Sequence, residues 1–245
     1  MMPVDPPGHF PHTRWTLIAR LKSPDAAIAR RALDELCVQY YYPLYCYIRR
    51  RGFERHDAQD ALHDFFAKVI RLAVFECAEA GSGRLRAFLS TALQRFLINW
   101  HRDNAHRERE VSLDLAPPGE DPERRYRSEH FTDTETPERV FDRKWGHELL
   151  ENVVRRLDQD YTVRGRKFFF DTLRPVLLAG GSLRGHDSAQ IASTLGISEG
   201  ALRVALSRLL GEYRAILEDE VRQTVETSDE VDGEIAHLLG VFSAD

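Results

Sequence analysis

The chain has 245 residues, of which 42% are apolar and 30% charged, with a net charge of −5. These values allow one large or two small packed domains and, with 10% aromatic residues, exclude disorder throughout. No apolar run approaches the roughly 20 residues of a membrane span, and the N-terminus lacks the apolar segment of a secretory signal. Three scattered cysteines suit neither a disulfide framework nor a zinc site. We therefore expect a cytoplasmic protein without membrane partner, metal or cofactor.

Charge is unevenly distributed along the chain. Residues 1–110 and 146–217 carry net charges of +4 and +2, whereas residues 111–145 and 218–245 carry −3 and −8. Contact with a polyanion depends on where basic groups gather rather than on the total charge. The two mildly basic blocks are therefore the candidates for nucleic-acid contact, and the acidic tail is not.

Helical periodicity dominates the first basic block. Apolar residues spaced by three and four from Leu33 to Ile48 predict a first helix, which Pro43 either kinks or divides in two. The same spacing predicts helices over about 57–73 and 84–103, separated by the breaker AEAGSG at 78–83. Residues 111–137 are rich in proline and charge without periodicity, which indicates a flexible acidic linker.

Helical patterns resume near Pro137, and residues 187–217 carry the most information. Gly196 permits a left-handed turn between two short apolar stripes. Ser198 is placed to cap the second helix. This small–turn–apolar order is typical of a helix-turn-helix, whose second helix enters the DNA major groove.

The second helix of this motif carries polar residues on its outward face, either as DNA contacts or as an ordinary solvated surface. Arginine at such positions can bind phosphates or guanine edges. The candidate residues are Ser198, Glu199, Arg203, Ser207 and Arg208.

Three segments in this order resemble the two conserved domains of extracytoplasmic-function (ECF) sigma factors of bacterial RNA polymerase. They are DAQDALHDFF at 57–66, GSGRLRAFLSTALQRFLINWHRD at 81–103 and QIASTLGISEGALRVALSRL at 190–209. The whole pattern is similar to a subgroup with a C-terminal extension. The resemblance implies an all-α protein with a helical polymerase- and minus-ten-binding domain over 13–110, a linker over 111–137, a helix-turn-helix domain over 138–217 and an acidic extension over 218–245.

The resemblance also implies a function, which is to direct core RNA polymerase to specific promoters without being an enzyme or acting on a small-molecule substrate. The partners would be core RNA polymerase, promoter DNA and an anti-sigma factor or other regulator. The helix-turn-helix residues above would read the minus-thirty-five element. The opened minus-ten element would be held by Arg84, Arg86, Arg95, Asn99 and Arg102. The polymerase would be bound by Asp57, Asp60, Asp64 and Phe66.

The sequence departs from the family pattern at several positions. His63 replaces the usual glutamine, Arg95 and Asn99 stand where asparagine and aspartate are usual, and the second helix of the helix-turn-helix has few basic residues. DNA binding by either domain alone is therefore expected to be weak, with affinity supplied by holding both domains on the polymerase.

Other classes remain open at this point. A helix-turn-helix regulator with a signal-sensing N-terminal domain would explain residues 187–217 equally well, and an interaction protein such as an anti-sigma factor would not need the outward arginines. Asp60 and His63, at i and i+3, resemble half of a carboxylate-bridged iron site, but no matching second helix is found. The Gly180–Ser182 turn lacks the spacing of a phosphate loop.

The acidic tail contains apolar residues that a purely solvating tail would lack. They predict a helix over about 230–241 that docks on another part of the chain or on a partner. One hypothesis is that this extension lies near the DNA-reading domain and lowers DNA affinity in the free protein. The alternative is a packing element that completes the C-terminal core.

Overall fold

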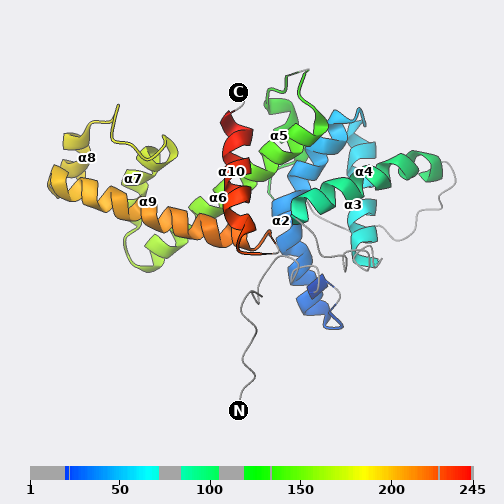
Figure 1. Cartoon of the computed structure of the whole chain (residues 1–245), viewed down its shortest axis with the longest axis horizontal. Helices are drawn as coiled ribbons and strands as arrows, with labels where there is room; N and C mark the ends of the chain where they lie inside the picture. Colours follow the sequence, from blue (N-terminus) through cyan, green and yellow to red (C-terminus); the bar gives the residue numbers. More distant parts are fainter. Residues whose placement is uncertain are drawn as a thin grey trace, which may run out of the picture. The chain divides into compact units, whose positions relative to one another are not determined.

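The computed structural model describes residues 20–21, 23–71, 84–104, 119–132, 134–225 and 227–243, and within them every regular element is an α-helix (Figure 1). The all-α expectation is confirmed for this part of the chain. The helices are α2 (Ala26–Arg50), α3 (Arg55–Arg71), α4 (Leu85–Asn104), α5 (Pro122–Ser128), α6 (Pro137–Val163), α7 (Lys167–Leu178), α8 (Ser188–Leu195), α9 (Glu199–Arg222) and α10 (Glu230–Ser243).

The chain forms two compact units, and their boundaries differ from those expected from the sequence. The first unit combines Met1–Glu148 with Val221–Asp245, and the second is Leu149–Glu220. The N-terminal part of α6 and the acidic tail therefore belong to the first unit, together with the segment expected to form a linker. Each unit is described below by itself.

Helix α2 forms the centre of the first unit. Asp25 caps its N-terminus by accepting a hydrogen bond from the backbone N–H of Ala27 at 2.8 Å. Every residue from Gln39 to Ile48 is buried, so neighbouring elements cover this half of the helix on all sides. Pro43 lies inside this single helix, so the alternative of a second helix starting there is wrong; the packing around a buried helix outweighs the local preference of one residue.

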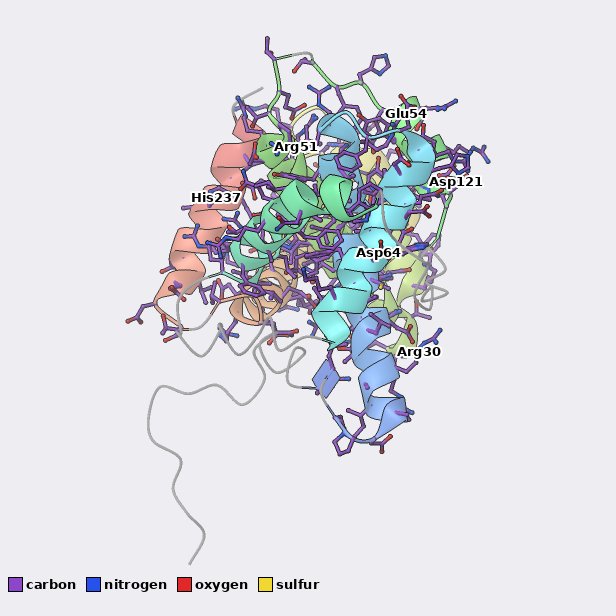
Figure 2. The ribbon with its side chains drawn as sticks, turned by 90° about the vertical axis from the view of Figure 1, so that its right-hand side faces the viewer. Arg30, Arg51, Glu54, Asp64, Asp121 and His237 are labelled. Carbon is purple, nitrogen blue, oxygen red and sulfur yellow. The ribbon has the colours of Figure 1, made fainter. Side chains whose placement is uncertain are left out.

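Helices α3 and α4 pack beside α2 through aromatic side chains. Phe66 of α3 stacks on Tyr41 of α2, with ring centroids 6.2 Å apart and planes 9° from parallel. Trp100 of α4 donates its indole N–H to Asp64 of α3 at 2.9 Å. Figure 2 labels Asp64 midway along α3. These contacts fix the spacing of α3 and α4, the two helices that carry most of the expected polymerase and minus-ten residues.

Helix α5 shows that the expected linker is partly folded. Asp121 caps this helix through the backbone N–H of Glu123 at 2.9 Å and pairs with Arg55 of α3 at 2.9 Å. Figure 2 shows Asp121 beside Glu54, at the end of the unit where α3 begins. The buried carboxylate of Glu123 pairs with Arg49 of α2 at 3.0 Å. A segment tied by these contacts is part of the first unit, because its charged groups find partners there.

The predicted tail helix is confirmed as α10, and it packs within the first unit. Its Leu238 and Phe242 lie against Gly146 of α6, where an added methyl group would come within 3.0 Å of both side chains. The Phe242 and His147 rings lie 5.5 Å apart. At the other end, the carbonyl oxygen of Thr224 accepts the N–H of Leu85, the first residue of α4, at 3.2 Å.

The second unit packs the C-terminal part of α6 with α7, α8 and α9 around one apolar core, which includes Leu157, Phe170 and Leu202. Charged groups join α6 to α9 at its edge. Arg156 pairs with Glu220 at 2.7 Å, and Arg164 pairs with Glu212 at 3.1 Å. This core holds the helix-turn-helix in place.

Candidate nucleic-acid interface

The helix-turn-helix has the local geometry that its sequence predicts. Asp187 caps α8 through the backbone N–H of Gln190 at 2.9 Å. Gly196 ends α8 in the left-handed region with φ of +66°. Ser198 then caps α9 by accepting the N–H of Ala201 at 3.2 Å. The turn between the helices is therefore fixed by three short-range features of the sequence.

Glu199 has a structural partner inside this motif. Its carboxylate accepts a hydrogen bond at 2.8 Å from the hydroxyl of Ser188, which starts the preceding helix. The contact links the first turns of α8 and α9. Glu199 is therefore a positioning residue of the motif, and its contact with DNA stays a prediction.

The outward face of α9 is rich in unpaired polar groups. Arg203, Ser207 and Arg208 are exposed, and Val204 between them is 52% exposed. Within the part of the chain that the structure describes, none of the three polar residues forms an ion pair or side-chain hydrogen bond, whereas Arg156 of the same unit is paired with two carboxylates. Arg203 and Arg208 are five residues apart and lie about 140° from each other around the helix axis, with Val204 and Ser207 between them on the solvent-facing side. Both arginines can therefore contact phosphates or base edges in a groove.

A second polar face lies on α4 of the first unit. Arg95 and Asn99 are both exposed, and the Asn99 amide donates to the carbonyl oxygen of Arg95 at 3.2 Å. Ile98 between them is 67% exposed. A cation, an amide and an apolar side chain therefore share one turn of solvent-facing helix. Arg102 lies in the same helix, but its side chain is outside the described residues.

Arg86 is not on an open surface, which corrects the expectation that it lines a DNA-binding face. Only 5% exposed, its guanidinium bonds to Glu234 of α10 at 2.6 Å and to Asp142 of α6 at 2.6 Å. It also lies over the ring of the buried Trp145, 5.2 Å from the centroid. Burial opposes the charged form, but the bonds to Glu234 and Asp142 outweigh it and raise the pKa of Arg86.

Arg84 shares the same carboxylate. Its Nε lies 2.7 Å from an oxygen of Glu234, and its side chain is about one-third exposed. His237 of α10, labelled in Figure 2, lies 3.3 Å from Asp142 through its Nε2. Two of the five residues expected at the minus-ten element are therefore engaged by the acidic tail in this structure.

The four expected polymerase-binding residues on α3 differ in how far they are exposed to solvent. Asp57 and Asp60 are exposed, and Asp64 is half-buried beside Trp100. Phe66 is 0% exposed, so the expectation that it forms part of a docking surface is corrected: it is a core residue. Only the two N-terminal aspartates are open to a partner.

The sequence pattern did not reveal two buried carboxylates of the first unit, Glu123 and Glu234. Glu234 lies between Val231 and Leu238 on one stripe of α10, and that position inside an apolar stripe was a signal that could have been used. Glu123 gave no comparable signal, because its helix has only seven residues and lies in a charged segment. Its role depends on α2, which is distant in sequence.

The described residues offer no metal centre or reactive thiol. They contain no cluster of three or more histidine, cysteine or acidic residues that could hold a metal ion. His63 instead lies 3.1 Å from the hydroxyl of Tyr41 through its Nε2. Burial raises the pKa of both Cys37 and Cys46 to about 12, which keeps these thiols protonated at neutral pH.

None of the described helices is long and apolar enough to cross a membrane.

No protein-family model, curated protein or solved structure matches this chain.

Proposed function

We propose that this chain is a sigma factor of the ECF class, which directs core RNA polymerase to specific promoters. The observation that carries the proposal is the exposed side of α9, the second helix of a capped helix-turn-helix, where Arg203, Ser207 and Arg208 have no partner among the described residues. The resemblance of three ordered sequence segments to that family supports the same function. The class would require no cofactor or catalytic residue.

In this function, α9 enters the major groove of the minus-thirty-five element. An arginine that bonds to the O6 and N7 atoms of a guanine discriminates against other bases by about 1–3 kcal/mol, and one that binds a phosphate adds affinity for any sequence. Ser207 lies between the two arginines and can donate or accept at either a base or a phosphate. The small number of basic groups favours modest affinity that is completed on the polymerase.

The α4 face of Arg95, Ile98 and Asn99 serves the opened minus-ten element. Arginine neutralises the backbone of a single strand, an exposed apolar side chain packs against an unstacked base, and an amide reads a base edge. Separately, Asp57 and Asp60 on α3 give a negative surface for a basic region of the polymerase. One unit would then hold both the enzyme and the opened DNA.

Reconstitution tests this function. The full chain is mixed with core RNA polymerase, the complex is isolated by gel filtration, and transcription is measured from a library of promoter fragments. The proposal expects a stable complex and transcription from a subset of promoters that depends on the added chain. Failure to bind core polymerase, with sequence-specific binding to duplex DNA retained, would instead identify a helix-turn-helix regulator.

One feature bears on that second function, in which the first unit would sense a small molecule. A pocket of about 180 Å³ lies between α2 and α5 and is lined by Val38, Tyr41, Tyr42, Pro122 and Arg125. Ligand-binding pockets usually range from about 300 to 1,000 Å³. This pocket is smaller than that range, so it does not support a small-molecule sensor.

A further inference from the structure

Helix α10 presents an unusual docking face to the first unit. Its buried stripe consists of Val231, Glu234 and Leu238, spaced by three and four residues, and the residue at its centre is a glutamate with 0% of its side chain exposed. A helix held only by packing would be stabilised more by an apolar residue there, because a buried charge loses its hydration. The reason for a carboxylate at position 234 must therefore lie in the groups that it contacts.

Two arginines of the first unit hold the Glu234 carboxylate. One of its oxygens lies 2.6 Å from Nε of Arg86, and the other lies 2.7 Å from Nε of Arg84 and 3.2 Å from Nη2 of Arg86. Paired guanidinium groups around an oxyanion bind carboxylate and phosphate by the same geometry. The pocket that holds Glu234 therefore has the chemistry of a phosphate site.

Among the described residues, Arg84 and Arg86 have two carboxylate partners only while α10 is docked. They face the carboxylates of Glu234 and Asp142. If α10 leaves, Asp142 is the one described carboxylate that still pairs with these two guanidinium groups. An anion is then favoured in place of Glu234, because two guanidinium groups with one carboxylate bind a further oxyanion.

Two apolar side chains of α10, Val231 and Leu238, are buried. Ile235, Val241 and Phe242 are half-buried, and Phe242 lies against Gly146 and His147 of α6, while Leu239 is 64% exposed. We expect a 14-residue helix with two fully buried apolar side chains to open at a lower free energy than the central helix α2. Its release is therefore compatible with an intact first unit.

We propose that α10 is a displaceable cover over a phosphate-binding site formed by Arg84 and Arg86, and that Glu234 holds this site until a phosphate of single-stranded DNA replaces it. The proposal rests on the proposed function of the first unit in binding the opened strand. Figure 2 shows α10, marked by His237, and α3, marked by Asp64, on different sides of this unit. The covered chain can therefore still present Asp57 and Asp60 of α3 to the polymerase.

The test uses the full chain and a fluorescent single-stranded DNA 12-mer, with affinity measured by anisotropy at low salt. Glu234→Gln removes the charge that competes with phosphate, and Gly146→Leu inserts a side chain where even a methyl group would meet Leu238 at 3.0 Å. Each variant is expected to bind DNA at least about fivefold more tightly, the lower end of usual coupling between linked sites. Adding Arg84→Ala to Glu234→Gln should abolish the gain.

Two matched control variants test whether any loss of negative charge, or any added leucine, on α10 would raise DNA affinity. Asp232→Asn removes one negative charge from the exposed face of α10, and Gly240→Leu adds the same side chain at a position with no neighbour within 4 Å. Neither should change DNA affinity by more than about twofold, because exposed charges are screened by water and salt. In the wild-type chain, DNA should also accelerate hydrogen exchange of the α10 amides.

Two results would contradict the proposal that α10 covers a phosphate-binding site. If Glu234→Gln and Gly146→Leu lower the melting temperature without a gain in DNA affinity, α10 is only a packing element. Binding to core polymerase, measured in parallel on the wild-type chain, keeps the two proposals apart. If the wild-type chain binds polymerase but the variants gain no DNA affinity, only the proposal that α10 covers a phosphate site is contradicted. If the variants gain DNA affinity but the wild-type chain does not bind polymerase, only the sigma-factor function is contradicted.

Discussion

Tyr45 of α2 donates a hydrogen bond from its phenol to the carboxylate of Glu123 on α5, a residue 78 positions later in the chain. The same carboxylate pairs with Arg49 at 3.0 Å and with Arg127 at 2.7 Å. Its side chain is 2% exposed, so three donors converge on a group that water hardly reaches. This cluster joins α5 to the central helix of the first unit.

Stability of the first unit should depend on the ionisation of Glu123. Burial opposes its ionisation, but the hydrogen bonds from Tyr45 and Arg127 and the nearby charge of Arg49 outweigh burial and lower its pKa below the ordinary value of 4.5. The stabilisation is therefore complete above pH 4.5 and is lost as the pH falls through the lower pKa of the folded state.

The variant Glu123→Gln makes this measurable by urea unfolding between pH 3 and pH 7. Near neutral pH it should be less stable than wild type by about 1–3 kcal/mol, the usual effect of losing charged hydrogen bonds at a buried site. The difference should shrink as the pH falls below 4.5. A difference that is constant across this range would show that the loss comes from packing alone.

Position 196 should require glycine because of its left-handed backbone conformation, and not because a side chain would collide with a neighbour. Its φ is +66°, and an added methyl group would meet nothing within 4 Å. Gly196→Ala is therefore expected to destabilise the second unit by about 1–2 kcal/mol, the strain of a left-handed residue with a side chain. Gly211→Ala, inside α9 and equally uncrowded, should stabilise it by up to about 1 kcal/mol. Thermal unfolding followed by circular dichroism compares the two.

The exposed arginines of α9 should contribute to DNA binding. Arg203→Ala with Arg208→Ala should weaken binding of the polymerase complex to its promoter, and a lost base contact should also relax specificity, by about 1–3 kcal/mol. Loss of a phosphate contact would instead reduce the slope of affinity against salt. Arg174→Ala, at an exposed position on α7, is the matched control. A double variant that transcribes like this control from every promoter would rule out DNA reading by α9.

The exposed aspartates of α3 should affect polymerase binding without affecting the fold. Asp57→Lys with Asp60→Lys is expected to reduce affinity for core polymerase by at least about tenfold, since reversed charges repel a basic partner. The unfolding transition should stay within about 0.5 kcal/mol of wild type. Asp64→Lys is a contrasting variant, because Asp64 accepts the Trp100 N–H at 2.9 Å and its loss should destabilise the first unit. Unchanged polymerase affinity in the double variant would remove these residues from the interface.

Short-range features of the fold were predictable from the sequence. The spacing of apolar residues predicted α3, α4 and α10 to within about two residues, and Gly196 with Ser198 predicted the turn of the helix-turn-helix. These features depend on backbone preferences and on periodicity within a few turns.

Long-range pairings were not predictable in this way. The sequence around Arg86 suggested a free cation near a nucleic-acid face, and only the fold shows that Glu234, 148 residues later, pairs with it. Likewise, the family resemblance placed Phe66 on a docking surface, whereas in the structure it belongs to the buried apolar stripe of α3 and stacks on Tyr41 of α2. Which charges meet across the chain is decided by tertiary packing, and periodicity carries no information about it.

The division of the first unit into two separate stretches of sequence has a consequence for synthesis on the ribosome. The second unit, Leu149–Glu220, is continuous and has all its residues once Glu220 has emerged. The first unit begins earlier but is completed later, because Glu234 and Leu238 are made after Glu220. During translation, Arg84 and Arg86 therefore remain without Glu234, the carboxylate that they share, until after the second unit has all its residues.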